Sequence, residues 1–129
     1  MADIAPDRTA PDIGAVLRAL GDPERRFLLT ALRDIGPLSA AALADVLSGW
    51  LATRREAGVV GSEERRRVEA RLHHVHLPVL EASGLVADRP AGVEVTSLDP
   101  PVERVVVAVL DASRAEANRR RRERVDDAR

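Results

Sequence analysis

Apolar residues in the first part of the chain recur at i, i+3, i+4 and i+7 in three successive segments. This spacing places them on one face of an α-helix. Asp12, Asp22 and Ser39 stand at the N-cap positions, and Gly21 and Gly36 stand where the first two helices should stop. The apolar positions are Ile13, Val16, Leu17 and Leu20; Leu28, Ala31, Leu32 and Ile35; and Leu43, Val46, Leu47 and Trp50. Each helix has one apolar face that the others must cover, which predicts a small helical bundle.

A fourth helix is predicted over residues 62–83, between a Ser62 cap and Gly84. At about 100° per residue, its side chains fall into an apolar stripe that we expect to be buried, an outer polar stripe and a mixed face. The three sets are Val68, Leu72, Val75 and Val79; Arg67, Arg71, His74 and Pro78; and Arg66, His73, Leu77 and Leu80. Because Pro78 lacks an N–H group, we expect the helix to bend there.

A short β-like segment follows, residues 84–97, with Arg89-Pro90-Ala91-Gly92 at its centre. The order of helix, glycine stop and hairpin is typical of a DNA-reading helix followed by a wing. The predicted fold is mainly α with a small β-hairpin wing, a winged helix-turn-helix plus a C-terminal helix. The third and fourth helices are joined by a polar loop longer than the turn of a minimal helix-turn-helix.

The segment after the hairpin starts with two prolines and carries valines at helical spacing, although its β-branched run would also suit a strand. We favour a helix over residues 99–118. We expect little domain surface to be left for this helix to cover, and therefore that it pairs with its twin in a homodimer. The expected contact residues are Val102, Val106, Val109 and Leu110. Residues 119–129 form a charged tail whose arginines either neutralise phosphates or lie on a solvated helix end.

Length and charge further limit the number of domains and the kinds of partner that we expect. A chain of 129 residues can form one hydrophobic core. We expect a disordered arm over residues 1–11 and a winged-helix domain over residues 12–98. Its 20 basic and 21 acidic residues leave a formal net charge of −1, so any attraction to nucleic acid must be local. Every basic residue is arginine, which suits paired carboxylates, phosphates and guanine edges but also fits a GC-rich genome.

Several functions are not expected. The chain has no Cys, Lys or Tyr, no phosphate-binding glycine loop and no serine elbow, so we expect no enzyme and no cofactor. His73, His74 and His76 are common types of metal ligand, but only His73 and His76 could share an ion within one chain. We therefore expect no metal. Without a leader-like start or a long apolar run, the chain should be cytoplasmic, with no membrane partner.

Two separated motifs carry a family resemblance. Residues 76–86 (HLPVLEASGLV) resemble the end of the recognition helix in ArsR-type winged-helix repressors, commonly H-L-x-x-L-x-x-x-G-L-V. Residues 20–29 (LGDPERRFLL) resemble the L-x-D-x-x-R-R-x-x-L opening motif of the same superfamily. Residues 72–78 (LHHVHLP) together with that opening are similar to a winged-helix family of unknown function abundant in halophilic archaea. The resemblance spans roughly residues 12–98 and implies binding to double-stranded DNA.

A winged helix-turn-helix places its recognition helix in the major groove and its wing along the backbone. Arginine there can bond bidentately to guanine. We expect Arg67, Arg71 and His74 at the groove and Arg89 at the wing tip, with Arg54 and Arg55 as secondary phosphate contacts. The alternative is that these arginines pair with nearby glutamates on a solvated face.

Two functions remain open. The first is a homodimeric, sequence-specific transcriptional regulator, favoured by the arginine face, the wing and the arginine-rich tail. The second is a winged-helix module that binds protein and not DNA, favoured by the near-zero net charge.

Overall fold

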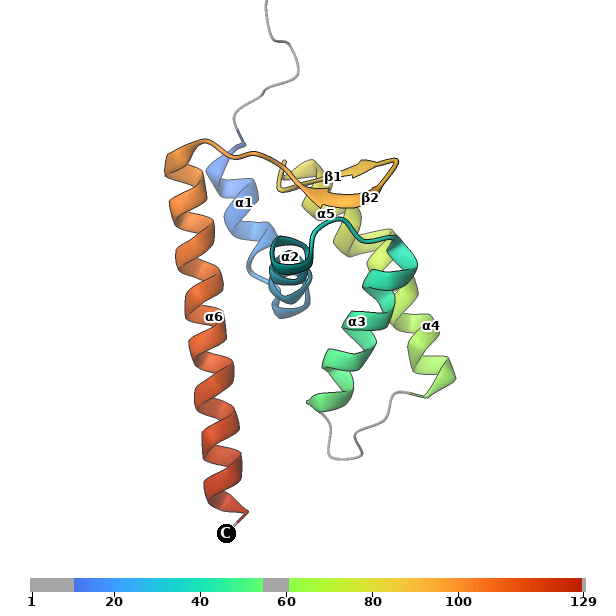
Figure 1. Cartoon of the computed structure of the whole chain (residues 1–129), viewed down its shortest axis with the longest axis vertical. Helices are drawn as coiled ribbons and strands as arrows, with labels where there is room; N and C mark the ends of the chain where they lie inside the picture. Colours follow the sequence, from blue (N-terminus) through green and yellow to red (C-terminus); the bar gives the residue numbers. More distant parts are fainter. Residues whose placement is uncertain (1–10, 55–60, 129) are drawn as a thin grey trace, which may run out of the picture.

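A computed structural model describes residues 11–54 and 61–128 of the chain. It is mainly α-helical, with a two-stranded hairpin followed by a long C-terminal helix, as the sequence predicted (Figure 1). The elements are α1 (Ile13–Ala19), α2 (Pro23–Ile35), α3 (Ala40–Thr53), α4 (Ser62–Arg71), the π-helical turn η1 (Leu72–His76), α5 (Leu77–Ala82), β1 (Val86–Arg89), β2 (Gly92–Val95) and α6 (Pro100–Asp127). The predicted disordered arm lies outside the described residues, except for Pro11. Within the described ranges, no helix is both long and apolar enough to span a bilayer.

The helix starts follow from local capping. The Asp12 carboxylate accepts hydrogen bonds from the first backbone N–H groups of α1, and Asp22 Oδ1 accepts one from Glu24 N at 2.8 Å. Ser39 Oγ accepts the N–H of Ala42 at 3.0 Å at the start of α3. These bonds satisfy donors that have no partner within the helix, so the N-caps predicted at Asp12, Asp22 and Ser39 are confirmed. The predicted Ser62 cap is wrong, because Ser62 is the first residue of α4, and the N-cap residue is Gly61, which makes no side-chain hydrogen bond.

The core lies where α2, α3, the α4–α5 segment and the hairpin meet. Its fully buried side chains include Leu28, Leu32, Leu43, Leu47, Leu72, Leu80 and Leu85. Not every predicted stripe residue joins them. Ile13 and Leu17 of α1 remain 45% and 49% exposed, because this short helix faces the core with Val16 and Ala19 instead.

A π-helical turn interrupts the predicted helix over residues 62–83. The N–H of Leu77 donates to the Leu72 carbonyl, five residues back, so one extra residue is inserted just before Pro78. The proline cannot donate to the His74 carbonyl and its ring would crowd it, and the wider turn accommodates both effects. The inserted residue shifts the register of the faces. Val75, expected in the core, is 44% exposed, whereas His76 is only 3% exposed.

The hairpin is anchored to the helical part by a third extended segment. Strands β1 and β2 pair antiparallel, with Val86 opposite Val95 and Arg89 opposite Gly92. Val93 also exchanges two backbone hydrogen bonds with Leu38, between α2 and α3, at 2.8 and 3.1 Å. Gly92 has a φ of 126°, and a Cβ there would lie 2.8 Å from the Leu38 carbonyl, so the close approach requires glycine.

Helix α6 covers the domain itself, which corrects the expectation that little surface remained for it. Its Val106 and Leu110 are buried in the core cluster, and it contacts α2. Arg33 of α2 forms an ion pair with Glu103, and Arg114 pairs with Asp34 at 2.7 Å. The helix continues without a break through the predicted tail to Asp127 (Figure 1), because alanine, glutamate and arginine favour helix there.

Candidate nucleic-acid interface

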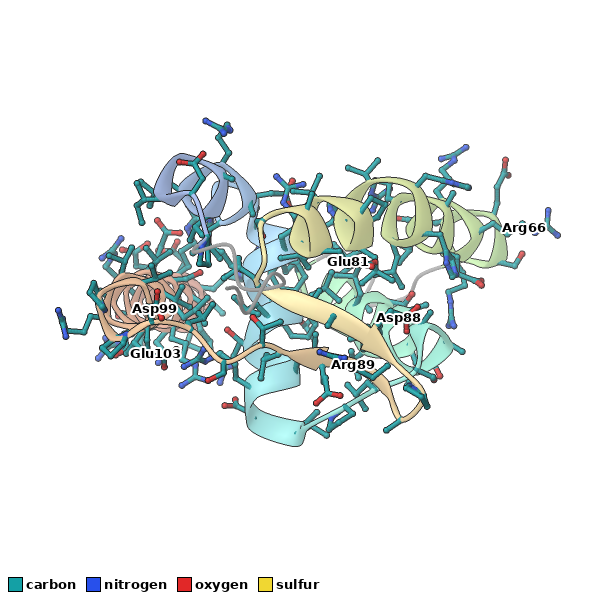
Figure 2. All side chains as sticks on the ribbon, turned by 90° about the horizontal axis from the view of Figure 1, so that it is seen from above. Arg66, Glu81, Asp88, Arg89, Asp99 and Glu103 are labelled. Atoms are coloured by element: carbon teal, nitrogen blue, oxygen red, sulfur yellow. The ribbon has the colours of Figure 1, made fainter. Side chains whose placement is uncertain are left out.

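The outer side of α4 and η1 carries a group of exposed polar side chains, and the hairpin that follows α5 carries a further exposed arginine. Arg66, Arg67, His73 and His74 are all exposed, as is Arg89 at the end of β1. Figure 2 shows Arg66 projecting from α4 away from the domain, and Arg89 on the hairpin. We call these five residues the α4–wing face. No part of the described domain covers it.

Arg67 makes an ion pair with Glu63 at 3.4 Å, one helical turn away, as the solvated-face alternative anticipated. Both side chains are well exposed, and such pairs contribute little and exchange readily with solvent or a ligand. Arg66 has no ion-pair partner among the described residues. In the sequence pattern Arg66 lies on the mixed face, and it is not among the residues expected to contact DNA. The feature of the sequence that could have indicated Arg66 is its position in the run of three arginines at residues 65–67.

Arg71, in contrast, is turned toward the domain. Its guanidinium donates to both carboxylate oxygens of Glu24 in α2, at 3.1 and 3.3 Å. This bidentate geometry is a strong form of ion pair and orients the side chain along the domain surface. The structure therefore separates Arg71 from the other expected groove residues and makes it a link between α2 and α4.

His76 belongs to the same link. Its Nε2 lies 2.8 Å from Glu24 Oε1, and its Nδ1 lies 3.4 Å from Arg25 Nη1. These contacts suit the imidazole tautomer with its proton on Nε2, which donates to the carboxylate and accepts from the guanidinium. Glu24, Arg25, Arg71 and His76, here called the Glu24 network, hold α4 and η1 against α2.

The Glu24 network joins the two motifs that carried the family resemblance. Glu24 and Arg25 lie in the opening motif, and His76 starts the second one. The burial of His76 beside exposed His73 and His74 also separates the histidines. Within the described ranges, no group of three or more His, Cys, Asp or Glu residues is placed to hold a metal ion.

The remaining predicted contacts lie apart. The guanidinium of Arg54 stacks over the Trp50 ring, 4.5 Å from its centroid, and lines a groove beside α6. Arg55 lies outside the described residues. Of the predicted dimer contacts, Val106 and Leu110 are buried within the chain, whereas Val102 and Val109 pack against the core but stay partly exposed. A dimer contact through Val106 or Leu110 would require α6 to leave its own core.

The comparison with known families identifies the family of the chain. Residues 17–96 match the domain of unknown function DUF7344, and the chain belongs to this family. The matched region begins in α1 and ends after β2, so it contains the Glu24 network and the α4–wing face but not α6. The search of curated proteins and the search of solved structures found no match.

Proposed function

We propose that the protein is a cytoplasmic, sequence-specific transcriptional regulator of the ArsR-like winged-helix type that binds double-stranded DNA as a homodimer. The recognition segment, residues 62–83, lies in the major groove, and the wing, residues 84–97, lies on the backbone. One observation carries the proposal: the residues of the α4–wing face, which are three arginines and two histidines from α4, η1 and the β-hairpin, are all exposed. A protein with this role acts by binding and not by catalysis.

Arg66, Arg67 and His74 are the proposed groove contacts, and Arg89 contacts a phosphate. Arginine in the major groove can discriminate guanine by bonding to O6 and N7. Arg71 has a different role, because its pairing with Glu24 fixes the angle of α4 relative to α2. The Glu24 network therefore positions the recognition segment without touching DNA.

The charge distribution sets the expected strength of binding. The net charge of −1 supplies no general attraction, and Glu63 stands beside Arg67 on the same face. Only a few phosphates can be neutralised by each subunit, so binding outside the operator should be weak. Two recognition segments in a symmetric dimer would double the number of specific contacts.

The test is fluorescence anisotropy of duplex DNA, first a mixed-sequence pool and then the selected site, over a salt series. We expect log K to fall with log salt and the Arg66→Ala/Arg67→Ala variant to bind at least about tenfold more weakly. The matched control, Arg18→Ala/Arg104→Ala, removes the same charge from exposed positions on α1 and α6 and should keep its affinity. Equal losses in both variants would contradict a specific role for the α4–wing face.

The alternative is a module that binds another protein. The exposed Val75 in the middle of the recognition segment favours it, because an apolar side chain on a binding face suits a protein surface. Val75 is also compatible with a thymine methyl group. Failure of the folded protein to bind any duplex at low salt would favour the protein-binding alternative.

A further inference from the structure

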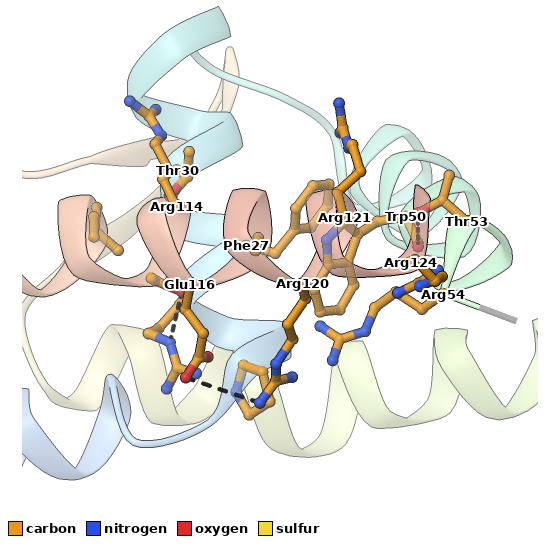
Figure 3. Close-up of a pocket in the computed structure, with 15 residues that line it drawn as sticks. Phe27, Thr30, Trp50, Thr53, Arg54, Arg114, Glu116, Arg120, Arg121 and Arg124 are labelled. Carbon is orange, nitrogen blue, oxygen red and sulfur yellow. Dashed lines mark hydrogen bonds and ion pairs between the residues drawn. The ribbon is translucent and has the colours of Figure 1, made fainter. Parts of the chain in front are cut away.

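A second surface lies between the distal half of α6 and the helices α2 and α3. It is a groove of about 490 Å³ (Figure 3). The groove is outside the α4–wing face, since none of that face's residues lines it. Its volume is within the usual range for sites that bind small organic ligands.

The floor of the groove is aromatic. Phe27 and Trp50, the only two aromatic residues of the chain, stack with their ring centroids 4.9 Å apart. Figure 3 shows both rings in the groove, with Arg54 beside Trp50. Aromatic rings and Leu110 together form an apolar surface against which a planar group can pack.

The walls of the groove are strongly basic. Six arginines from three parts of the fold line it: Arg26, Arg54, Arg114, Arg120, Arg121 and Arg124. The only carboxylate in the lining is Glu116, which lies 3.8 Å from Arg120. The described residues provide no carboxylate partner for Arg121 or Arg124. Arg114 pairs with Asp34, which lies outside the lining, at 2.7 Å. With two of the six arginines paired to carboxylates, the groove keeps a local excess of positive charge in a chain with a net charge of −1.

We propose that this groove binds a nucleotide, a small ligand that combines a planar ring with two or more phosphate charges. The guanidinium groups of α6 can bind phosphate oxygens bidentately. The base packs on the aromatic floor, as bases do on Trp and Phe in other nucleic-acid sites. A base that stacks on Trp50 replaces the Arg54 guanidinium, which becomes available to pair with phosphate.

Such a ligand would join α6 to α2 and α3 across the groove. In the structure, this half of α6 is held to α2 by polar contacts, including the bond from Arg26 Nε to Ser113 Oγ at 3.0 Å. A nucleotide bound by both sides adds further contacts between the same helices. Nucleotide binding here is independent of DNA binding by the α4–wing face.

Trp50 provides the measurement, because it is the only tryptophan in the chain and lies in the groove. We would titrate the full-length protein with ATP, with tripolyphosphate and with adenosine, and follow tryptophan fluorescence. ATP should quench the emission saturably. Tripolyphosphate should compete with ATP but quench less, and adenosine should bind much more weakly, because each supplies only one of the two features.

Paired variants distinguish a specific ATP site from general attraction between ATP and the arginines of α6. Arg121→Ser/Arg124→Ser should weaken ATP binding at least about tenfold. Arg119→Ser/Arg122→Ser removes the same charge from the same stretch of α6 but outside the groove lining, and should change it less than about twofold. Circular dichroism would establish that both variants are folded.

Three results would overturn the proposal. The first is the absence of a saturable response to ATP in the folded protein. The second is an equal loss of affinity in both double variants. The third is a tighter response of Trp50 to short duplex DNA than to ATP, which would make the groove a contact for the DNA backbone.

Discussion

At the scale of single residues, the role of His76 is the hardest to predict from the neighbouring sequence. It stands among three histidines within four positions, yet it alone is buried and bonded on both ring nitrogens. A buried polar group that loses a partner incurs a desolvation cost, so the Glu24 network should be sensitive to the loss of any member. The exposed histidines of the same segment have no such constraint.

We expect His76→Ala to destabilise the protein by about 2–4 kcal/mol, because it leaves a cavity and removes the partner of Glu24 and Arg25. The matched change His73→Ala, on the exposed side of η1, should stay within about 0.5 kcal/mol of the wild type. Urea unfolding followed by circular dichroism measures both. Similar small losses in the two variants would show that the network does not stabilise the fold.

At the scale of elements, the recognition segment and α6 both depart from their simple helical patterns. A regular rotation of 100° per residue correctly predicts the burial of Val68 in α4 and of Leu72 at the start of η1. It fails after Leu72, where the π-helical turn exchanges the positions of Val75 and His76 relative to the core. In α6 the valine run is helical, and its buried side faces α2 and not a second subunit.

Two neighbouring valines of α6, Val106 and Val107, test which side of this helix packs against α2. Val106 is fully buried and Val107 is exposed. We expect Val106→Ala to cost about 2 kcal/mol of unfolding free energy, from two lost carbon atoms and the cavity they leave, and Val107→Ala to cost less than about 0.5 kcal/mol. Thermal and urea unfolding at low protein concentration would compare them. If Val107→Ala were the more damaging change, α6 would pack through its other side.

At the scale of the whole molecule, the near-neutral chain separates its charges into distinct surfaces. Arg67 of the α4–wing face pairs with Glu63 beside it, and the groove beside α6 is lined by six arginines and one glutamate. Helix α1 carries an exposed apolar pair, Ile13 and Leu17, one helical turn apart. A DNA-binding homodimer must also bury surface between its subunits. With Val106 and Leu110 used inside the chain, the apolar side of α1 is a more accessible contact.

Sedimentation velocity would test the dimer. We expect a dimer at micromolar concentration, and Ile13→Arg/Leu17→Arg should shift it toward monomer, because burying two guanidinium groups without partners is strongly unfavourable. Ile35→Arg is the matched control, since Ile35 is 63% exposed at the far end of α2 and the change should leave the dimer intact. A monomer in the wild-type protein would contradict the homodimer.

The sequence by itself determined the order of the helices, three of their N-caps and the hairpin. Capping by Asp12, Asp22 and Ser39 depends only on residues two or three positions away, so these signals are readable without the fold. The same holds for the glycine stops. Each of these features is a local property of the chain.

Only the tertiary structure decided which side chains meet. The pairing of Arg71 and His76 with Glu24 joins residues about fifty positions apart, and the groove joins Phe27 and Trp50 to arginines near the C-terminus. No local pattern specifies such contacts, because they depend on how complete helices pack against one another. The π-helical turn added a change of register that a regular helical period cannot represent. The sequence therefore predicted the elements, whereas the packing of the helices against one another determined the contacts of Arg71, His76 and Val106.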